Sequence, residues 1–502
     1  MELESEVNVT SSRTFRTLHL AMLIPIALSS FTHLWNPAGF PDLFFDEGIY
    51  MRRAMHVLEY GDPQGTNFHD HPFFGQIFLA AALATVGYPD SLNPTSDAQS
   101  IESLYLVPRI LMGVLAVVDT FLIYKISERR YNSKVAIIAS ILFAVMPITW
   151  FVRRILLDSI LLPLLLTSIL FAVYTKNMKA SESSGRRNYA LIMLSGVFLG
   201  LAIFTKLPIV TMIPLIGFLI YSNTGKKIAS IGFWIIPVIL IPLIWPLESV
   251  ASGQFEVWVN DVFWQASRDS NRATQVLEPF FIIDPVLLLT GSAGVGYAAM
   301  KRDPIIMLWL FPFLLFLSFV GYAQYFHIIP IIPLFCIAAA FLITGLASKA
   351  KSAKKENVIA FGTLVPLAIF GLVSTTYLIT SNMTSAQFEA AGFVLAIADA
   401  DTSIIASPVY SWMYIYVFNV NNTFHEYLDV LYYPIPTEKI IIISDNHLEN
   451  DLGMSEKLKQ LHSATHPVKI FEGAVLNYDL NRYPHTSMHK NYEGSKVEVR
   501  TN

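Results

Sequence analysis

A chain of 502 residues that is 54% hydrophobic and only 14% charged differs from soluble domains, in which about a quarter of the residues are charged. We therefore predict a protein that crosses the membrane several times. The formal net charge of −4 argues against nucleic acid as a partner, because nucleic-acid-binding proteins carry a basic surface. The single cysteine, Cys336, excludes an intrachain disulfide.

About eleven apolar runs are long enough to cross roughly 30 Å of hydrocarbon as helices. They lie at 17–35, 102–124, 134–151, 155–175, 189–205, 207–223, 228–247, 281–299, 304–321, 325–346 and 357–380. The first run follows Arg13 and Arg16, as the apolar core of a signal peptide would. Since no small-residue cleavage site follows it, we expect an uncleaved first span.

The basic residues predict the orientation of these spans. With about eleven spans, every basic cluster falls on the same side of the membrane. The clusters are Arg13/Arg16, 125–134, 176–187, Lys226-Lys227, Lys301-Arg302 and 349–355. We therefore expect a cytoplasmic N-terminus and an external C-terminal segment. Separately, we expect a multi-pass protein of a prokaryotic cell membrane.

Two long external loops are predicted between the spans. The apolar run at 72–87 is short, and counting it as a span would move one basic cluster to the outside. We therefore predict one external loop at 36–100, with an amphipathic helix near 46–60 and a second, apolar helix along the interface. A second external loop is expected at 248–280, where tryptophans are typical of interfacial anchors.

The composition changes after residue 380, where short apolar segments alternate with turn residues. Strands are predicted at 402–407, 414–418 and 439–444, and a helix at 448–462. We expect residues 381–502 to form a small, soluble, external α/β domain. Residues 1–380 would form the all-α transmembrane domain.

Ionisable side chains from several segments are predicted to meet at the outer membrane face. They include Asp46, Glu47, Asp70, His71, Arg153, Arg154, Asp158, Lys206 and His327. A single arginine or lysine there is more often a snorkelling side chain, but acids and bases gathered on one face mark a functional site. Cations can bind a phosphate and stabilise it as a leaving group, while a carboxylate accepts a proton from an attacking hydroxyl or amine.

Several short motifs stand in order along residues 15–345. They are Asp46-Glu47-Gly48-Ile49-Tyr50, His71-Pro72-Phe73-Phe74-Gly75, the segment from Arg153 to Asp158, Gly200-Leu201-Ala202-Ile203-Phe204-Thr205-Lys206, and the segment from Tyr325 to Pro333. Together they resemble GT-C glycosyltransferases of the protein O-mannosyltransferase and aminoarabinose lipid A transferase type. Val152 and Phe73 depart from the family pattern, in which Ser and Pro stand at these places.

The resemblance implies a polytopic enzyme that takes a sugar, a hexose such as mannose, from a polyprenyl- or dolichyl-phosphate donor. The acceptor would be a protein, lipid or glycan at the external face, and the transfer would be a single displacement with inversion. By the same resemblance, Asp46 matches the acceptor-binding base and Glu47 its partner, while the donor phosphate would contact Arg153, Lys206, Tyr325 and His327. Supporting roles would fall to Asp70, His71, Arg154 and Asp158.

Other interpretations stay open. His69, Asp70 and His71 could hold a divalent metal, or could form a hydrogen-bonded loop without one. A polyprenyl-lipid or sugar transporter or flippase would favour repeats and broken midplane helices, which the sequence lacks. A non-catalytic subunit of a glycan assembly complex would not need Asp46. The sugar, the acceptor and the oligomeric state do not follow from the sequence.

Overall fold

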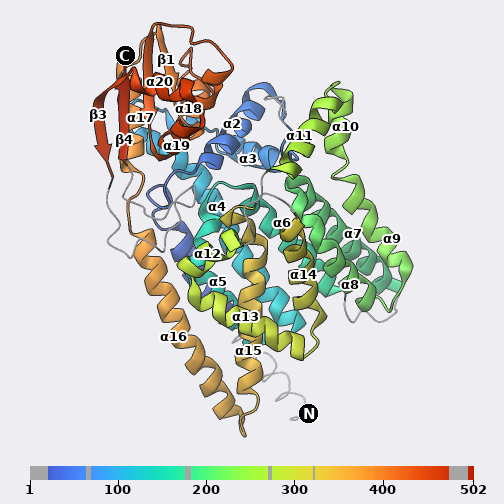
Figure 1. Ribbon diagram of the computed structural model, residues 1–502. Helices are drawn as coiled ribbons and strands as arrows, with labels where there is room; N and C mark the ends of the chain where they lie inside the picture. The colour runs from blue at the N-terminus through green and yellow to red at the C-terminus, as the bar shows by residue number, and fades with distance from the viewer. Residues whose placement is uncertain (1–20, 64–68, 176–181, 269–273, 320–322, 474–495) are drawn as a thin grey trace.

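The computed structural model describes residues 21–63, 69–175, 182–268, 274–319, 323–473 and 496–502. Figure 1 shows a helical bundle with a small sheet at one end, which we call the sheet end. The bundle begins with a helix at Ala21–Leu34; residues 17–20 of the first predicted span lie outside the described residues. The remaining bundle helices are α4 (Ala98–Arg130), α5 (Ser133–Val145), η2 (Pro147–Arg153), α6 (Leu157–Tyr174), α7 (Glu182–Thr205), η3 (Leu207–Met212), α8 (Ile213–Asn223), α9 (Ile228–Leu240), α12 (Thr274–Ile283), α13 (Pro285–Met300), α14 (Pro304–Phe319), η4 (Tyr325–Ile331), α15 (Ile332–Ala347) and α16 (Ala353–Ile379).

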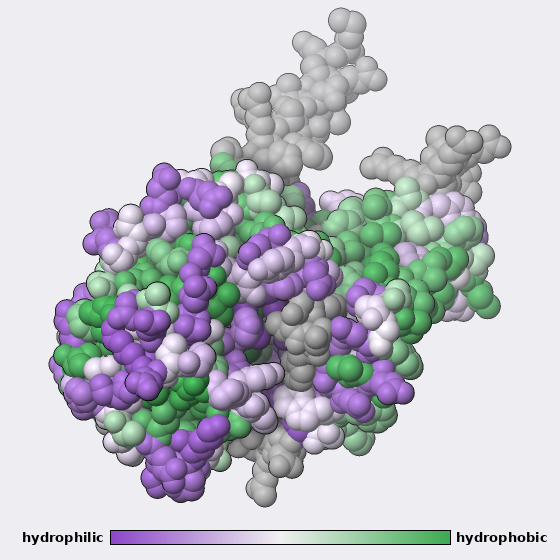
Figure 2. All heavy atoms as spheres, turned by 90° about the horizontal axis from the view of Figure 1, so that it is seen from above, coloured by the Kyte–Doolittle hydropathy of each residue, from purple (hydrophilic) through white to green (hydrophobic). Residues whose placement is uncertain are grey.

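These helices make the protein a multi-pass membrane protein. Within the described ranges, six helices are long and apolar enough to cross a membrane, or up to eight if each of two bent pairs is one span. Where the structure describes them, the predicted apolar runs coincide with helical segments, but the count of about eleven spans is not confirmed. Figure 2 shows hydrophilic residues gathered over the sheet end. Exposed apolar side chains lie along the helical span Ile228–Ala251, as expected for a lipid-facing surface. Phe233, Ile236 and Leu247 are among them.

Two helix pairs of the bundle are bent. α5 and η2 meet at 70°, and α12 and α13 meet at 115°. Proline follows each break, at Pro147 and Pro285, because a proline cannot continue the helix before it but suits the first turn of the next one. The Asp284 carboxylate accepts the backbone N–H of Leu287 at 2.8 Å and so caps α13. The predicted span at 134–151 is therefore a helix followed by a bent 3-10 turn.

Two further groups of helices lie between the spans, toward the sheet end (Figure 1). α2 (Phe45–Tyr60), α3 (Phe74–Ala84) and η1 (Asp90–Leu92) belong to the first predicted external loop, and confirm a helix near 46–60 and a second, apolar one after it. α11 (Phe255–Ser267) belongs to the second, while α10 (Ile244–Ala251) and α12 cross its two predicted boundaries. These loops therefore place helices beside the ends of the spans.

The C-terminal part contains a four-stranded mixed sheet. Its strands are β1 (Thr402–Ile405), β2 (Lys439–Ser444), β3 (His466–Glu472) and β4 (Lys496–Thr501), in the order β1-β2-β4-β3. β1 and β2 are parallel, and the other two pairs are antiparallel. The helices around the sheet are α17 (Ser385–Ile397), α18 (Pro408–Tyr416), η5 (Tyr427–Leu431), α19 (Asn446–Asp451), η6 (Leu452–Met454) and α20 (Glu456–Ser463).

Two sequence predictions for this part were wrong. The segment 414–418 is rich in aromatic and β-branched residues and was expected to form a strand, but most of it lies in α18. α18 buries Trp412 and Tyr414 and packs closely on α2, where a Cβ at Gly48 would collide with the backbone of Pro408. Tertiary packing thus overrides the strand propensity. The predicted helix at 448–462 is interrupted at η6, which contains the helix-weakening Gly453.

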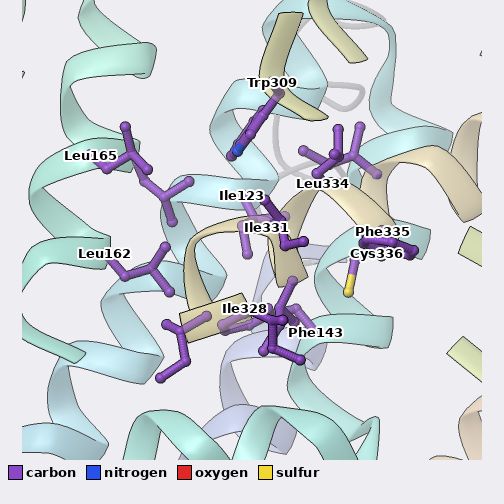
Figure 3. Packing of buried hydrophobic residues seen from close by; sticks show 14 of the residues in the cluster. Ile123, Phe143, Leu162, Leu165, Trp309, Ile328, Ile331, Leu334, Phe335 and Cys336 are labelled. Carbon is purple, nitrogen blue, oxygen red and sulfur yellow. The ribbon is translucent and has the colours of Figure 1, made fainter. Parts of the chain in front are cut away.

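The main hydrophobic core lies inside the bundle. Figure 3 shows buried side chains of α4, α5, α6, α14, η4 and α15 meeting there, among them Ile123, Phe143 and Trp309. A second cluster joins α2, α3 and α4 to the sheet through residues such as Met51 and Ile441. The sheet end is thus fastened to α2, whose first turn carries Asp46.

Candidate active site

Asp46 and Glu47 lie in the first turn of α2, where acidic side chains are stabilised by the positive end of the helix dipole. The Glu47 carboxylate turns back and accepts the backbone N–H of Phe44 at 3.0 Å. Asp46 is only partly buried, whereas Glu47 is fully buried. The two adjacent carboxylates therefore have different surroundings.

Glu47 is the centre of a buried ion-pair network. Arg109 donates to both of its carboxylate oxygens, at 3.1 and 2.6 Å. Arg154 donates at 3.3 Å and also pairs with Asp42, and the backbone N–H of Ile155 donates at 3.0 Å. Glu47 thus ties the first turn of α2 to α4 and to the segment before α6.

A cavity of about 210 Å³ lies next to this region. Its polar lining residues are Asp70, His71, Asp158, Lys206, Gln265 and His327. The rest of its lining is mainly apolar and includes Leu207, Trp245, Phe313 and Leu317. One cavity thus combines a charged region with apolar walls.

Lys206 and Asp158 form a close ion pair in this cavity. The Lys206 Nζ lies 2.6 Å from the Asp158 Oδ2, and both side chains are almost fully buried. Lys206 follows the last residue of α7 and precedes the proline-initiated η3, so its side chain is held at a break in the bundle. Its ammonium also lies 5.1 Å from the centre of the Phe326 ring, a cation–π contact.

Asp70 and His71 contribute a second polar group. Arg53 pairs with Asp70 at 2.8 Å. Burial alone would favour the neutral acid, but Arg53 and His71 hold the pKa of Asp70 below its usual value. Burial, only partly offset by Asp70, lowers the pKa of His71 to about 4, so this imidazole is neutral at neutral pH. The Nδ1 of His327 accepts the backbone N–H of Gln324 at 3.0 Å, which leaves the proton on Nε2.

Asp46 is electrostatically coupled to the cavity. Burial raises the pKa of Asp46 to about 6, and Lys206 partly offsets this effect. Asp70 and Asp158 raise the pKa further, since a like charge nearby disfavours ionisation. A carboxyl group that titrates near the working pH is suited to accept and release a proton.

The structure does not bring every predicted residue to the cavity. Arg153 donates to the backbone carbonyls of Thr32, Trp35 and Asn36 and lies outside the lining. Arg154 is engaged with Glu47, and Tyr325 is buried among aromatic rings. The predicted phosphate contacts at Arg153 and Tyr325 thus lack support from the cavity.

His69, Asp70 and His71 were the candidates for a metal site. A ring nitrogen of His69 is 2.9 Å from the Gln254 Oε1, and its backbone N–H donates to Asp261 at 2.7 Å. Among the described residues, no group of three His, Cys, Asp or Glu is placed to hold a metal ion.

Two cations near the site were not among the predicted site residues. Arg53 is seven residues after Asp46, two helical turns along the same face of α2, so the helical period could have indicated it. Arg268 follows α11, packs on the Trp264 ring, and lowers the pKa of Asp46 and of His71. The sequence places Arg268 in the second predicted external loop, and the packing of α11 against the cavity brings it near the site.

Comparisons with known proteins bear on the fold of the chain. The family model of dolichyl-phosphate-mannose-protein mannosyltransferase matches residues 99–248. ArnT from Cupriavidus metallidurans bound to undecaprenyl phosphate is similar in structure, with a TM-score of 0.57 at 11% identity, over 96% of this chain and 97% of that one. The chain has the GT-C fold. No curated protein matches the sequence.

The archaeal oligosaccharyltransferase of Archaeoglobus fulgidus is also similar. Its structure tethered to an acceptor peptide has a TM-score of 0.55 at 10% identity, over 86% of this chain and 69% of that one. Its complex with Zn and sulfate has a TM-score of 0.54 at 11% identity, over 87% and 69%. The predicted fold class, a polytopic helical GT-C protein with a small α/β part, is thereby confirmed.

Proposed function

We propose that this GT-C protein is an integral-membrane glycosyltransferase acting at the external membrane face. It would move a sugar, a hexose such as mannose, from a polyprenyl- or dolichyl-phosphate donor to a protein, lipid or glycan acceptor. The observation that carries the proposal is the cavity in which Lys206, His71 and His327 meet apolar walls. A lipid phosphate has two parts that match this cavity: an anionic group that suits Lys206, and a hydrocarbon chain that suits the apolar walls.

The donor phosphate binds beside Lys206 in this scheme. The ammonium group and the two imidazoles are hydrogen-bond donors for phosphate oxygens, while Trp245, Phe313 and Leu317 contact the first part of the hydrocarbon chain. An incoming phosphate competes with Asp158 for Lys206, so the carboxylate keeps the ammonium in position while the cavity is empty.

Asp46 acts as the general base. The acceptor hydroxyl or amine attacks the anomeric carbon, and the bond from that carbon to the phosphate oxygen breaks with inversion. The bonding electrons leave with the phosphate, whose developing charge Lys206 stabilises. The proton of the acceptor passes to Asp46, which returns it to solvent. Glu47 keeps the first turn of α2 in place through Arg109 and Arg154.

The similar structures support both the lipid-phosphate donor and the acceptor in this proposal. ArnT is known with undecaprenyl phosphate bound, and the Archaeoglobus fulgidus enzyme with an acceptor peptide tethered to it. The family model supports mannose as the first sugar to test. The assay combines the purified protein with a polyprenyl-phosphate mannose labelled in the sugar, together with peptide, glycolipid and glycan acceptors. Absence of both transfer and hydrolysis with every lipid-phosphate sugar would refute an enzymatic role.

Replacing Lys206 with Gln is expected to weaken donor binding by about 10- to 100-fold, because the ammonium makes charge-assisted contacts with the phosphate. The measurement is the KM for the polyprenyl-phosphate sugar. Since the single variant leaves Asp158 buried without its cation, the double variant Lys206→Gln/Asp158→Asn is measured beside it. Lys301→Gln, which removes a lysine from an exposed position, is the control. Unchanged KM values in both variants would contradict the phosphate site.

The activity should depend on pH through Asp46. A base must be ionised to accept a proton, and the pKa of Asp46 is raised to about 6. We therefore expect kcat/KM to rise between about pH 5 and 7 and then to level off. Stability should change in the opposite direction: the folded state binds this proton more tightly, so the stability contributed by Asp46 decreases as the pH rises through about 6. A flat kcat/KM profile across this range would exclude Asp46 as the base.

A further inference from the structure

A second cavity lies at the opposite end of the bundle. Its volume is about 210 Å³, and its lining includes Arg130, Val173, Phe218, Asn223 and Ile305. It combines one cationic side chain with amide and apolar groups, as the first cavity does.

The two cavities lie along the same helices. α6 contributes Asp158 to the first and Val173 to the second, and α14 likewise contributes Phe313 and Ile305. At a rise of 1.5 Å per residue, the stretch of α6 between Asp158 and Val173 is about 22 Å long. Because a hydrocarbon core is roughly 30 Å thick, the second cavity lies near the other face of the membrane.

Arg130 has donor groups available for a ligand in this cavity. Its Nη2 is 3.3 Å from the Asp303 Oδ2, a long contact for an ion pair. Its Nε is buried and has no hydrogen-bond partner within the described ranges. The other carboxylate oxygen of Asp303 caps α14, at 2.9 Å from the backbone nitrogen of Ile305. Asp303 therefore does not use all the hydrogen-bond donors of the Arg130 guanidinium.

The charged residues around the second cavity also favour the binding of an anion. α4 ends with Arg129 and Arg130, and Lys301 and Arg302 stand in the short link between α13 and α14. Lys125, one turn earlier on α4, is paired with Glu128 at 2.9 Å. The helix ends around the cavity thus carry more cations than acids.

We propose that this second cavity binds the phosphate of a membrane lipid headgroup, in the leaflet opposite the candidate active site. The guanidinium of Arg130 holds the phosphate oxygens, as arginine does at phosphate sites. Val173, Phe218 and Ile305 contact the apolar part of the lipid next to the headgroup. Such a lipid fastens the ends of α4, α6, α8 and α14 to one another, and two of these helices, α6 and α14, also line the first cavity.

The test is lipid binding to the full-length protein in detergent, followed by native mass spectrometry during titration with dioleoylphosphatidylglycerol. Wild type is expected to retain one tightly bound lipid, and Arg130→Gln to bind it at least about tenfold more weakly. Arg129→Gln is the matched control, because Arg129 is the adjacent arginine on α4 but does not line the cavity. Ser222→Tyr narrows the cavity without removing Arg130 and should also weaken binding.

Three results would overturn the proposal. The first is equal binding by the Arg130→Gln and Arg129→Gln variants, with Ser222→Tyr also unchanged. The second is equally tight binding of dioleoylglycerol, which has no phosphate. The third is inorganic phosphate bound as tightly as the lipid, which would assign the site to a soluble anion. Because Ser222→Tyr keeps the Arg130–Asp303 pair, it tests the site even if Arg130→Gln fails to fold.

Discussion

Asp46→Asn is expected to lower kcat by about 10²- to 10⁴-fold, the usual range for loss of a general base. The amide has nearly the same shape as the carboxylate but cannot accept the proton of the acceptor. Since Asp46 lies in the first turn of α2 and is only partly buried, the variant should fold and bind the donor normally. The measurement is sugar transfer from a polyprenyl-phosphate donor at saturating acceptor.

Glu59→Gln is the control for this variant, because Glu59 is an exposed acid on the same helix. It should transfer sugar at the wild-type rate. Retained transfer by Asp46→Asn would remove the general-base assignment. Loss of donor hydrolysis as well as transfer would agree with it, since water must also give up a proton when it attacks.

Glu47→Gln is expected to cost about 3–5 kcal/mol of stability, as does breaking a buried ion pair by removing one partner. The change leaves the guanidinium groups of Arg109 and Arg154 buried with less negative charge around them. The measurement is the free energy of unfolding in mixed detergent micelles, with Asp46→Asn as the matched neighbour. Asp46→Asn, which changes the adjacent carboxylate, should lower the free energy of unfolding only slightly.

The double variant Glu47→Gln/Arg109→Gln tests the physical reason for this loss. Removing Arg109 together with Glu47 lowers the uncompensated charge, so the combined loss of stability should be smaller than the sum of the two single losses. A stable Glu47→Gln protein that is as inactive as Asp46→Asn would instead make Glu47 a direct partner in catalysis.

The contrast between Asp46 and Glu47 shows the limit of sequence reasoning at this site. Both acids were expected to face the acceptor, because they are adjacent in a motif. On a helix, however, neighbouring residues point about 100° apart, and the tertiary structure buries only one of them. Glu47 therefore contacts Arg109, while Asp46 is electrostatically coupled to Lys206.

Lys206 and Arg153 show a similar contrast. Each was predicted at the outer end of a span and each is buried. Lys206 lines the cavity, whereas Arg153 donates to carbonyls at the end of the first helix. The chain bends by 70° between α5 and η2, the turn that ends at Arg153; Pro147 marks the break in the sequence, but the direction of the bend depends on packing.

Composition and apolar runs by themselves determined that this is a multi-pass helical protein with helices in the long loop after its first predicted span. These features depend on local periodicity and on the free-energy cost of charge in hydrocarbon, which act within a single segment. Only the tertiary structure decided which charged groups share a cavity, that 414–418 joins a helix, and that Glu47 holds the fold together. Those features depend on contacts between segments distant in the chain, and a sequence pattern does not specify which faces of two helices meet.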